Sequence, residues 1–492
     1  MISEVGDVAI VGAGFAGSIM ALVLKQAGLK PILLERGAHP RFAIGESSTP
    51  LANLALEELG RAYDLPQLVA LSEFGRWQKT YPQLACGLKR GFSYFTHRSG
   101  QPFAPDPAHA NELLVAASPV DEVADTHWFR EHIDAFFAAE VQKVGIAYFD
   151  RTEITTTDHG NGWKLQCRQG ENAVEVKAKF LIDATGPGGF LPHTLNIDTR
   201  PDNLRTDCWS VYTHFEGVSL WEDILRARGA DVAAHPFPCD AAALHHLVDE
   251  CWIWVLRFNN GITSAGIAFD GSRSSPNAAL TPEQEWRRIL VKYPAIGDHF
   301  QNARPVQPWV RTGRLQRLAR HMVGPDWALL PHAAYFLDPF FSAGNAHTLH
   351  GIQRLARILV EHKERPSLEK QLLAYEELLK REIQVVDKLV HGSYRAFRQF
   401  DLFTAYSMHY FAAAHTCETR RRNGHAPPGS GFLLADDPVF CAGLDQSYET
   451  LLTLPESAPI PRALVSEFHQ KVAEAIVPFN TAGLADPSKL NM

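Results

Sequence analysis

The sequence predicts an α/β fold with a second, mixed β-sheet domain and a helical C-terminal region. Three observations support this prediction. Residues 8–34 read as a strand, a glycine-rich turn, a helix and a second strand. The run Phe180–Gly186 is apolar and ends in Asp and Gly, which is typical of a strand that returns to the same sheet. Apolar residues alternate with strand period between residues 190 and 300, and with helical period beyond residue 366.

The N-terminal unit has the spacing of a dinucleotide-binding turn. Gly12, Gly14 and Gly17 follow a strand (8–11) and open a helix (16–27) through Phe15 and Ala16. Gly12 permits the tight turn, Gly14 lets the backbone approach a pyrophosphate, and Gly17 allows close packing of helix on strand. The N–H groups at the start of the helix can bind the anion. An ordinary glycine turn in a βαβ unit is the alternative.

An acid follows the second strand (31–34) at the position where a ribose would lie. Glu35 can accept hydrogen bonds from two vicinal hydroxyl groups, and it would repel a 2′-phosphate. The sequence therefore predicts a Rossmann-like domain that binds a dinucleotide without a 2′-phosphate.

Composition narrows the classes of function. The 492 residues are 46% hydrophobic and 21% charged, with a net charge of −8 and no basic tract, so neither nucleic acid nor a membrane surface is an expected partner. The first strand begins within a few residues and no apolar run could span a bilayer, which predicts a cytoplasmic protein. Seven cysteines without a C-x-x-C pair predict neither a disulfide framework nor a zinc site.

The next part of the chain carries two polar features. The loop 45–50 (Gly-Glu-Ser-Ser-Thr-Pro) precedes a predicted helix (51–59), so it could reach a cofactor or simply cap that helix. Residues 86–95 alternate like one strand, which places Lys89 on the face of Phe95 and small residues. A solvated lysine on a strand is the simpler interpretation of Lys89 when it is taken alone.

The remaining elements are predicted from pattern alone. We expect a Pro- and Ala-rich excursion (101–124), which could act as a lid, and then a helix (126–144). A three-stranded meander (154–157, 163–167 and 174–177) and an antiparallel sheet (208–215, 251–258 and 262–269) should follow. Three further helices are expected at 344–359, 368–390 and 394–417. The predicted division is 1–85, 126–190 and 301–365 for the cofactor domain, 86–125 and 191–300 for the substrate domain, and 366–492 for a helical region appended to them.

Several ordered motifs resemble those of the flavin-dependent halogenases, and more those of the phenol and pyrrole types than of the tryptophan type. They are the glycine turn, the loop 45–50, Lys89 in a Lys-x-Gly-Phe-x-Tyr strand, Trp252-Ile253-Trp254-Val255-Leu256, and Asp338-Pro339-Phe340-Phe341-Ser342-Ala343-Gly344. Together they span most of residues 5–400.

The resemblance implies a function. Reduced FAD, supplied by a separate flavin reductase, would react with O₂ and oxidise a halide to hypohalous acid. Lys89 matches the lysine that holds this acid, by hydrogen bonding or as a haloamine, beside an electron-rich aromatic ring. The substrate would be a small phenol or pyrrole, free or tethered to a carrier. The sequence leaves the oligomeric state open.

The resemblance also implies a set of site residues. We expect the cofactor to be bound by Gly12, Gly14, Phe15, Ala16, Gly17, Glu35, Arg36, Arg41, Ser47, Ser48, Thr49, Asp338, Gly344 and Asn345. We expect Ser342, Ala343, Trp252, Trp254 and Arg257 to line the halide and substrate sites. The turn 342–344 opens a helix whose N–H groups suit a halide and negative charge on the reduced flavin, although Ser342 could also be an ordinary helix cap.

The chain departs from the family pattern at four positions. Leu256-Arg257 replaces the usual Ile-Pro, which puts an arginine where the wall beside the isoalloxazine is expected. Pro331-His332 replaces Gly-Asp, Ala343 replaces a threonine, and Phe341 replaces the glutamate of tryptophan halogenases. These changes keep two alternatives open, a flavin hydroxylase or other oxidoreductase of the same fold and a flavin-binding protein without turnover.

Two histidine pairs have the side chains that commonly bind metals. His347 and His350 share one helical face, and His245 and His246 are adjacent, but neither pair has a third ligand at suitable spacing. The prediction is that they are buried or supporting histidines, with no metal site.

Overall fold

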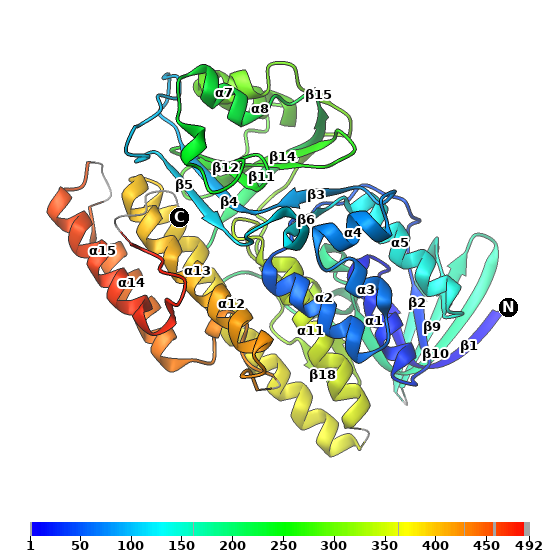
Figure 1. Ribbon diagram of the computed structural model, residues 1–492. Helices are drawn as coiled ribbons and strands as arrows, with labels where there is room; N and C mark the ends of the chain where they lie inside the picture. The colour runs from blue at the N-terminus through cyan, green and yellow to red at the C-terminus, as the bar shows by residue number, and fades with distance from the viewer. Residues whose placement is uncertain (1, 161, 363, 428, 456–458, 487–492) are drawn as a thin grey trace.

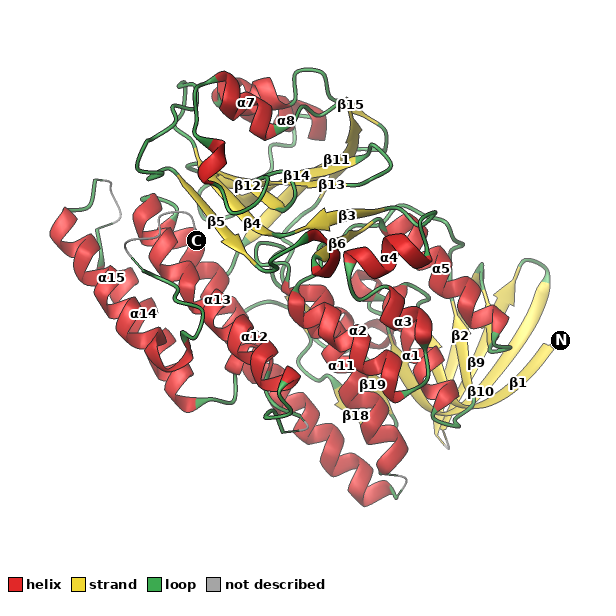
Figure 2. Ribbon diagram, viewed as in Figure 1, coloured by secondary structure: helices red, strands yellow, loops and turns green. Residues whose placement is uncertain are grey.

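The structure is a computed structural model that describes residues 2–486 except 161, 363, 428 and 456–458. Figure 1 shows three parts around a common centre: a sheet with helices at the right, a second sheet at the top, and long helices at the left. The colouring by secondary structure in Figure 2 separates the strands of the two large sheets from the helices that cover them.

The first sheet has a parallel core in the order β19-β10-β1-β2-β7. Its strands are β1 (Ile2–Val11), β2 (Pro31–Leu34), β7 (Ala147–Phe149), β10 (Asn172–Asp183) and β19 (Trp327–Leu329). The predicted strand 174–177 and the run 180–183 are one strand, β10, which pairs with β1 along most of its length. Its first part also pairs with β9 of the meander and its last part with β19. The predicted α/β fold with a Rossmann-like domain is confirmed.

Helices and a meander flank this sheet. The helices α1 (Phe15–Gln26), α2 (Pro50–Ala62), α5 (Arg130–Lys143) and α11 (Ala343–Glu361) pack on one another and on the sheet. The meander is β8 (Thr152–Gly160), β9 (Gly162–Gln169) and the start of β10. The predicted helix 126–144 begins only at Arg130, because Asp125–Trp128 form β6 instead.

The second sheet forms the lobe at the top of Figure 1. Its order is β15-β11-β14-β13-β12-β4-β5, with β16 also paired to β11. The strands are β4 (Gly91–Thr96), β5 (Glu112–Ala116), β11 (Cys208–Glu216), β12 (Ala243–Leu247), β13 (Cys251–Arg257), β14 (Thr263–Asp270), β15 (Arg304–Pro305) and β16 (Val310–Arg311). This second sheet is mixed, because β12 and β4 pair in parallel while its other pairs are antiparallel. β5 lies inside the predicted excursion 101–124, so part of that stretch is a sheet strand rather than a loop.

The stretch 86–95 is two strands rather than one. β3 (Cys86–Lys89) pairs with β6 (Asp125–Trp128), whereas β4 joins the second sheet, and the chain turns between them at Arg90. The predicted alternation therefore fails at Arg90. Lys89 does not share a face with Phe95, since its Nζ atom lies over the ring of Phe92.

The C-terminal region is helical, as predicted, but it is not an appendage. It comprises α12 (Arg365–Ala396), α13 (Phe400–Arg422), α14 (Pro438–Thr453) and α15 (Arg462–Ile476). Tyr410 of α13 stacks on Phe341 with ring centres 4.3 Å apart, and Phe403 packs against Phe340 and Tyr94. The long helices thus complete the wall between the two sheets.

Short elements fill the connections. They are α3 (Pro66–Ala70), α4 (Phe74–Thr80), α6 (Phe190–Thr194), α7 (Trp221–Ala227), α8 (Pro282–Lys292), α9 (Pro294–His299), α10 (Pro331–Ala334), β17 (Arg317–Leu318), β18 (Val323–Gly324) and β20 (Tyr335–Phe336). The predicted domain boundaries stay a prediction.

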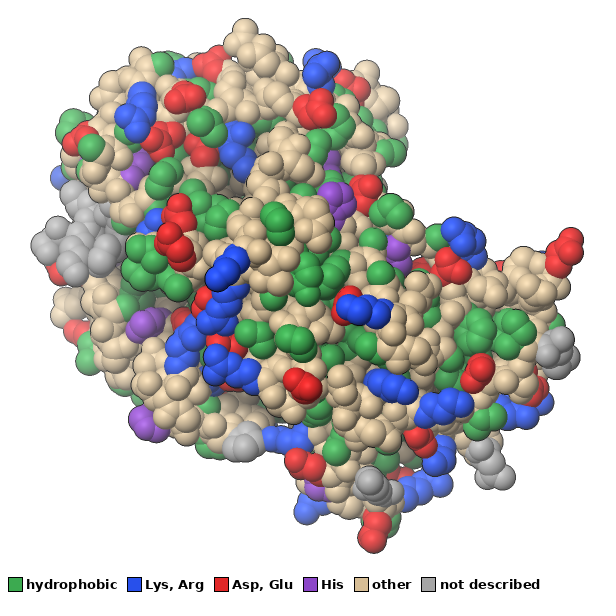
Figure 3. All heavy atoms as spheres, turned by 45° about the vertical axis from the view of Figure 1, so that its right-hand side comes forward, with side chains coloured by type: hydrophobic (Ala, Val, Ile, Leu, Met, Phe, Trp, Pro, Cys, Tyr) green, Lys and Arg blue, Asp and Glu red, His purple; other side chains and the backbone are tan. Residues whose placement is uncertain are grey.

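The surface agrees with the mixed charge of the sequence. On the face shown in Figure 3, Lys and Arg side chains lie interspersed with Asp and Glu side chains. Among the described residues, none of the helices has both the length and the apolar character needed to cross a bilayer.

Candidate flavin and lysine sites

The glycine turn adopts the geometry that its sequence predicts. Gly12 has a φ of 103°, a conformation that side-chain-bearing residues rarely adopt. A Cβ at Gly17 would stand 1.9 Å from the carbonyl oxygen of Gly12, so only glycine fits there. Gly14 is the N-cap of α1, and nothing lies nearer than 3.7 Å to a Cβ built on it. The turn is therefore a cradle in which a Cβ on the second glycine would only reach van der Waals contact with Arg130 and Asp134.

Glu35 ends β2 and is buried beside this turn. Its carboxylate accepts hydrogen bonds from the N–H of Ala13 (2.9 Å) and of Gly37 (2.7 Å), and it lies 3.4 Å from the Arg41 guanidinium. These bonds fix the carboxylate next to the glycine turn. Arg36 and Arg41 are themselves exposed.

An ion pair at the same turn was missed from the sequence. The Arg130 guanidinium lies 4.8 Å from the ring centre of Phe15, and it donates to Ile44 O (2.9 Å) and to the Asp134 carboxylate (2.8 Å). Asp134 also accepts from the N–H of Phe15 (3.1 Å), at the start of α1. The i, i+4 spacing of Arg130 and Asp134 was a signal that could have revealed the pair. It was overlooked because the helix was predicted to begin too early, at residue 126.

The loop 45–50 joins the start of α11 to Lys89. The amide nitrogen of Asn345 donates to Gly45 O (3.2 Å) and Ser47 O (3.4 Å). On its other side the loop pairs with β6, where Ser48 N donates to Thr126 O (3.0 Å). Thr49 starts α2 but makes no side-chain cap, so the bonds of this loop reach well beyond the helix it precedes.

The turn before α11 is strained and open. Ser342 has a φ of 53° and makes no side-chain cap with α11, so it is not an ordinary helix cap. No heavy atom lies within 4 Å of the place that a Cβ on Gly344 would take. A non-glycine residue in the left-handed region beside an open helix N-terminus is a feature that clusters at ligand-binding sites.

Lys89 is completely buried between the loop and the aromatic interior. Its Nζ atom donates to Ser47 Oγ (2.9 Å) and Ser48 O (2.6 Å), and it lies 4.0 Å from the ring centre of Phe92. Burial lowers the pKa of Lys89 below its ordinary value, and the nearby Asp125 opposes that shift. The side chain is thus a candidate for an amine that gains and loses a proton within the working pH range.

Asp125 is the second missed residue. It stands opposite Lys89 in the β3–β6 ladder, and one carboxylate oxygen accepts from the amide of Asn53 (2.8 Å) while the other is buried without a hydrogen bond. Burial raises the pKa of Asp125, and Lys89 opposes that shift. The pairing could not be read from the sequence because Asp125 was expected at the end of an excursion rather than in a strand.

A buried hydrogen-bond chain ends on Asp338. Trp252 Nε1 donates to the hydroxyl of Tyr394 (2.7 Å), which donates to Asp338 Oδ2 (2.8 Å). The Cys208 thiol donates to the same oxygen (3.0 Å), and burial raises the pKa of Asp338 to about 6. Trp254 Nε1 lies 3.3 Å from Ser264 Oγ. Tyr394 was missed because it comes from the C-terminal helices.

Arg257 lies on the other face of the sheet from the two tryptophans. Trp252 and Trp254 face the centre of the molecule, whereas Arg257 donates to the Asp240 carboxylate (2.8 Å) and to Val218 O (3.1 Å). This placement corrects the expectation that Arg257 shapes the wall beside the flavin, because residues at odd spacing on a strand point to opposite faces.

The histidines discussed above as possible metal ligands make hydrogen bonds within the protein. His347 lies between the Tyr335 hydroxyl and the Glu382 carboxylate, which is 2.7 Å from its Nε2. His350 accepts from Arg421, and His246 bonds the rings of His97 and His299. His332, in place of the family's aspartate, lies with its Nε2 3.0 Å from Ala184 O.

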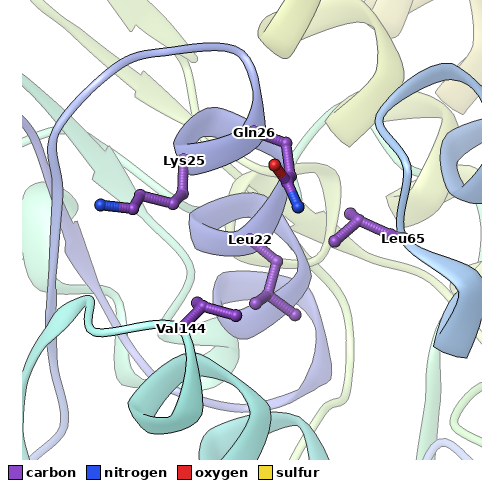
Figure 4. A pocket seen from close by; sticks show the side chains of 5 residues that line it. All are labelled: Leu22, Lys25, Gln26, Leu65 and Val144. Carbon is purple, nitrogen blue, oxygen red and sulfur yellow. The ribbon is translucent and has the colours of Figure 1, made fainter.

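Two cavities lie away from Lys89 and the glycine turn. One of about 260 Å³ is lined by the side chains labelled in Figure 4, Leu22, Lys25, Gln26, Leu65 and Val144, at the opposite end of α1 from the glycine turn. The other, of about 840 Å³, lies between α2, α11 and α13 and includes Arg354, Arg357 and Arg420. Neither is lined by Lys89 or the glycine turn, so neither is the site described above.

The residues at the parallel sheet fit FAD. The cradle at Gly14 and the N–H groups of α1 suit a pyrophosphate, the Glu35 carboxylate beside the turn suits ribose hydroxyls, and the space at Gly344 suits a flat ring. When bound and reduced, FAD supplies the electrons that activate O₂.

Comparisons with known proteins agree with this geometry. A family model described as FAD dependent oxidoreductase matches residues 7–213. Monodechloroaminopyrrolnitrin halogenase PrnC of Pseudomonas fluorescens is 29% identical over 90% of this chain and 79% of its own length. Tetracycline 7-halogenase of Kitasatospora aureofaciens is 30% identical over 81% of this chain and 71% of its own.

A solved structure extends the likeness to the whole fold. The crystal structure of halogenase PltM in complex with phloroglucinol and FAD superposes with a TM-score of 0.87, at 27% identity, and covers 99% of each chain. The similarity therefore includes both sheets and the C-terminal helices. This chain belongs to the flavin-dependent halogenase family.

Proposed function

We propose that this protein uses reduced FAD, O₂ and a halide to halogenate a phenol- or pyrrole-type ring, and that Lys89 delivers the halogen. The observation that carries the proposal is the position of Lys89. A lysine with 0% exposure, held by Ser47 and Ser48 and facing an aromatic interior, has no evident role in packing or solubility.

The contacts of the loop 45–50 support two separate sites, one for the halide and one for transfer of the halogen. One side of the loop contacts Asn345 at the start of α11, and the other side binds the Lys89 amine. We assign the halide to the turn Ser342–Gly344 at the N-terminus of α11, where a Cβ on Gly344 would meet open space, and the halogen transfer to Lys89. Ala343 offers no hydroxyl, so the halide contacts there would come from the backbone.

The transfer balances as two steps. The unprotonated Lys89 amine attacks the halogen of hypohalous acid, an N–halogen bond forms, and hydroxide leaves and takes up the released proton as water. The ring carbon then attacks that halogen, the N–halogen bond breaks, and the nitrogen takes up a proton. The ring loses a proton in exchange, so that the Lys89 amine is regenerated. The lowered pKa of Lys89 favours the amine that the first step needs. If the amine stays protonated, it holds the acid by a hydrogen bond and polarises it toward the same transfer.

The substrate class follows from the interior and from the relatives. The names of PrnC and tetracycline 7-halogenase indicate ring substrates, and PltM was solved with phloroglucinol, a phenol. Phe341 stands where an indole-activating glutamate would be needed, and Tyr410 stacks on it. We therefore favour a free phenol or pyrrole, with a carrier-tethered ring as the variant to be tested, and reduced FAD from a separate reductase.

The test is a halogen-incorporation assay. Purified protein is given FAD, a flavin reductase, NADH, O₂ and bromide with a panel of phenols, pyrroles and indoles, and the products are read by mass spectrometry for the bromine isotope doublet. The doublet on a phenol or pyrrole supports the proposal. An oxygenated product without bromine would instead establish the hydroxylase, and oxygen consumption without a ring product would leave only flavin binding.

A further inference from the structure

A cluster of two histidines and one glutamate lies on the second lobe, away from the flavin and lysine sites. His109 Nδ1 lies 2.5 Å from Glu112 Oε1, and His235 Nε2 lies 3.1 Å from the same oxygen. The three potential ligand atoms all lie within 4.8 Å of one another, and within the described residues theirs is the one cluster of this kind. The side chains of Glu112 and His235 are buried (6% and 2% exposed), whereas His109 is 15% exposed.

We propose that His109, Glu112 and His235 bind a divalent cation of the Zn²⁺ class, which fastens the loop before β5 to the segment after α7 (Trp221–Ala227). Two imidazole nitrogens and one carboxylate oxygen are a donor set that Zn²⁺ prefers, with water in the fourth position. Zinc can be bound by this donor set without any cysteine ligand.

The geometry needs little adjustment to accept the ion. Donors in a tetrahedral zinc site with bonds of about 2.0–2.1 Å stand roughly 3.3–3.4 Å apart. The two short contacts would therefore open by less than about 1 Å. Each neutral imidazole would present a lone pair instead of its N–H. The partial exposure of His109 gives the ion a route from solvent.

The ligands are held in place before any ion binds. His109 has a φ of 54°, and its N–H donates to Asp106 O (2.8 Å), while Asn111 Nδ2 donates to Ala104 O (2.7 Å). Glu112 begins β5 and is fixed by the sheet. His235 follows a 3₁₀ turn that the Asp231 carboxylate caps. A left-handed non-glycine residue at a cluster of ligating groups is a usual form of stored strain at a binding site.

The charge of the cluster also suits a cation. One oxygen of the Glu112 carboxylate faces both imidazoles, 2.5 Å from His109 Nδ1 and 3.1 Å from His235 Nε2. A cation would satisfy it while joining two segments that are far apart in the sequence, residues 109–112 and 235.

The experiment uses the full-length protein without an affinity tag. After chelation and dialysis, the protein is titrated with Zn²⁺, followed by calorimetry and elemental analysis, and separately with Co²⁺, followed by its visible absorption. We expect about one equivalent of Zn²⁺, a Co²⁺ spectrum of four- or five-coordinate type, and a rise in Tm with added Zn²⁺.

Variants assign the binding to these residues. His109→Ala, His235→Ala and the isosteric Glu112→Gln should each lose the Co²⁺ spectrum and the zinc-dependent rise in Tm. His159→Ala is the matched control, because His159 also pairs with a carboxylate, Asp326 at 2.8 Å, without a third ligand. If the wild type binds no zinc, or if His109→Ala and Glu112→Gln bind it as well as the wild type, the cluster is only hydrogen-bonded and the proposal is wrong.

Discussion

The Nζ atom of Lys89 lies 4.0 Å from the ring centre of Phe92, and the lysine side chain is completely buried. We predict that Lys89→Met abolishes halogen incorporation, by a factor of about 100 or more, because the amine that receives the halogen is lost. FAD affinity should stay close to that of the wild type, because the described contacts of Lys89 are with the loop 45–50 rather than with the glycine turn.

Lys79 offers a control for this change. It is an exposed lysine at the end of α4, ten residues earlier in the chain. Lys79→Met should leave halogenation unchanged. A Lys89→Met protein that still yields the bromine doublet would exclude the lysine-centred mechanism, whereas loss of both FAD binding and activity would show a structural defect.

Asp125 should set the pH dependence of the same step. Its carboxylate opposes the lowering of the Lys89 pKa, so Asp125→Asn should lower that pKa further and extend activity to lower pH. The amide can still accept from Asn53. The measurement is kcat/KM against pH for the two proteins. An unchanged rising limb would mean that the Lys89 amine is not the group that the profile reports.

A substitution at Gly344 should weaken flavin binding while leaving the stability of the fold nearly unchanged. A Cβ at this position meets no protein atom, so Gly344→Ala should change the free energy of unfolding of the apoprotein by about 1 kcal/mol or less. If the isoalloxazine occupies that space, FAD affinity should fall by about tenfold or more, as measured by flavin fluorescence. Gly17→Ala is the contrast, since its Cβ would collide with Gly12 and destabilise the protein itself.

The Glu382 carboxylate should stabilise the packing of α12 on α11. Its carboxylate accepts from Arg354 (2.6 Å and 2.8 Å), His347 (2.7 Å) and Phe432 N (2.6 Å). Glu382→Gln would leave Arg354 as a buried charge without its carboxylate, at a cost of about 3–5 kcal/mol in urea denaturation. Glu369→Gln, in an exposed ion pair with Arg365, should cost less than about 1 kcal/mol.

Buried histidines should make the fold sensitive to mild acid. Burial lowers the pKa of His97, His127, His245, His299 and His409 to about 3. Between about pH 6.5, the ordinary value, and these lowered values the unfolded chain binds more protons than the native protein. The free energy of unfolding should therefore fall as the pH falls through that window. Urea denaturation at several pH values measures this, and equal stability at pH 7.5 and 5 would contradict it.

The sequence predicted local patterns better than contacts between distant segments. The glycine turn and Glu35 form one compact unit of the chain, so their spacing alone located them. Lys89 was identified from its motif, but its neighbours were not, because the chain turns at Arg90 and Asp125 enters a strand. Arg257 was placed on the wrong side for a similar reason, since its motif does not reveal which face of the sheet it occupies.

Residues contributed by α12 and α13 could not be predicted at all. Tyr394, Phe403 and Tyr410 lie fifty or more residues beyond the turn 338–344 that they touch, and an amphipathic helix does not specify its partner. The prediction that the helical region is an appendage failed at this level of long-range packing.

The bond from Tyr394 to Asp338 has a consequence for protein engineering. A minimal enzyme cannot be cut from this chain at residue 364, because the truncation would remove the hydroxyl that Asp338 binds and would expose Phe340 and Phe341 to water. Chimeras that exchange substrate preference between relatives should carry α12 and α13 along with the sheet they line.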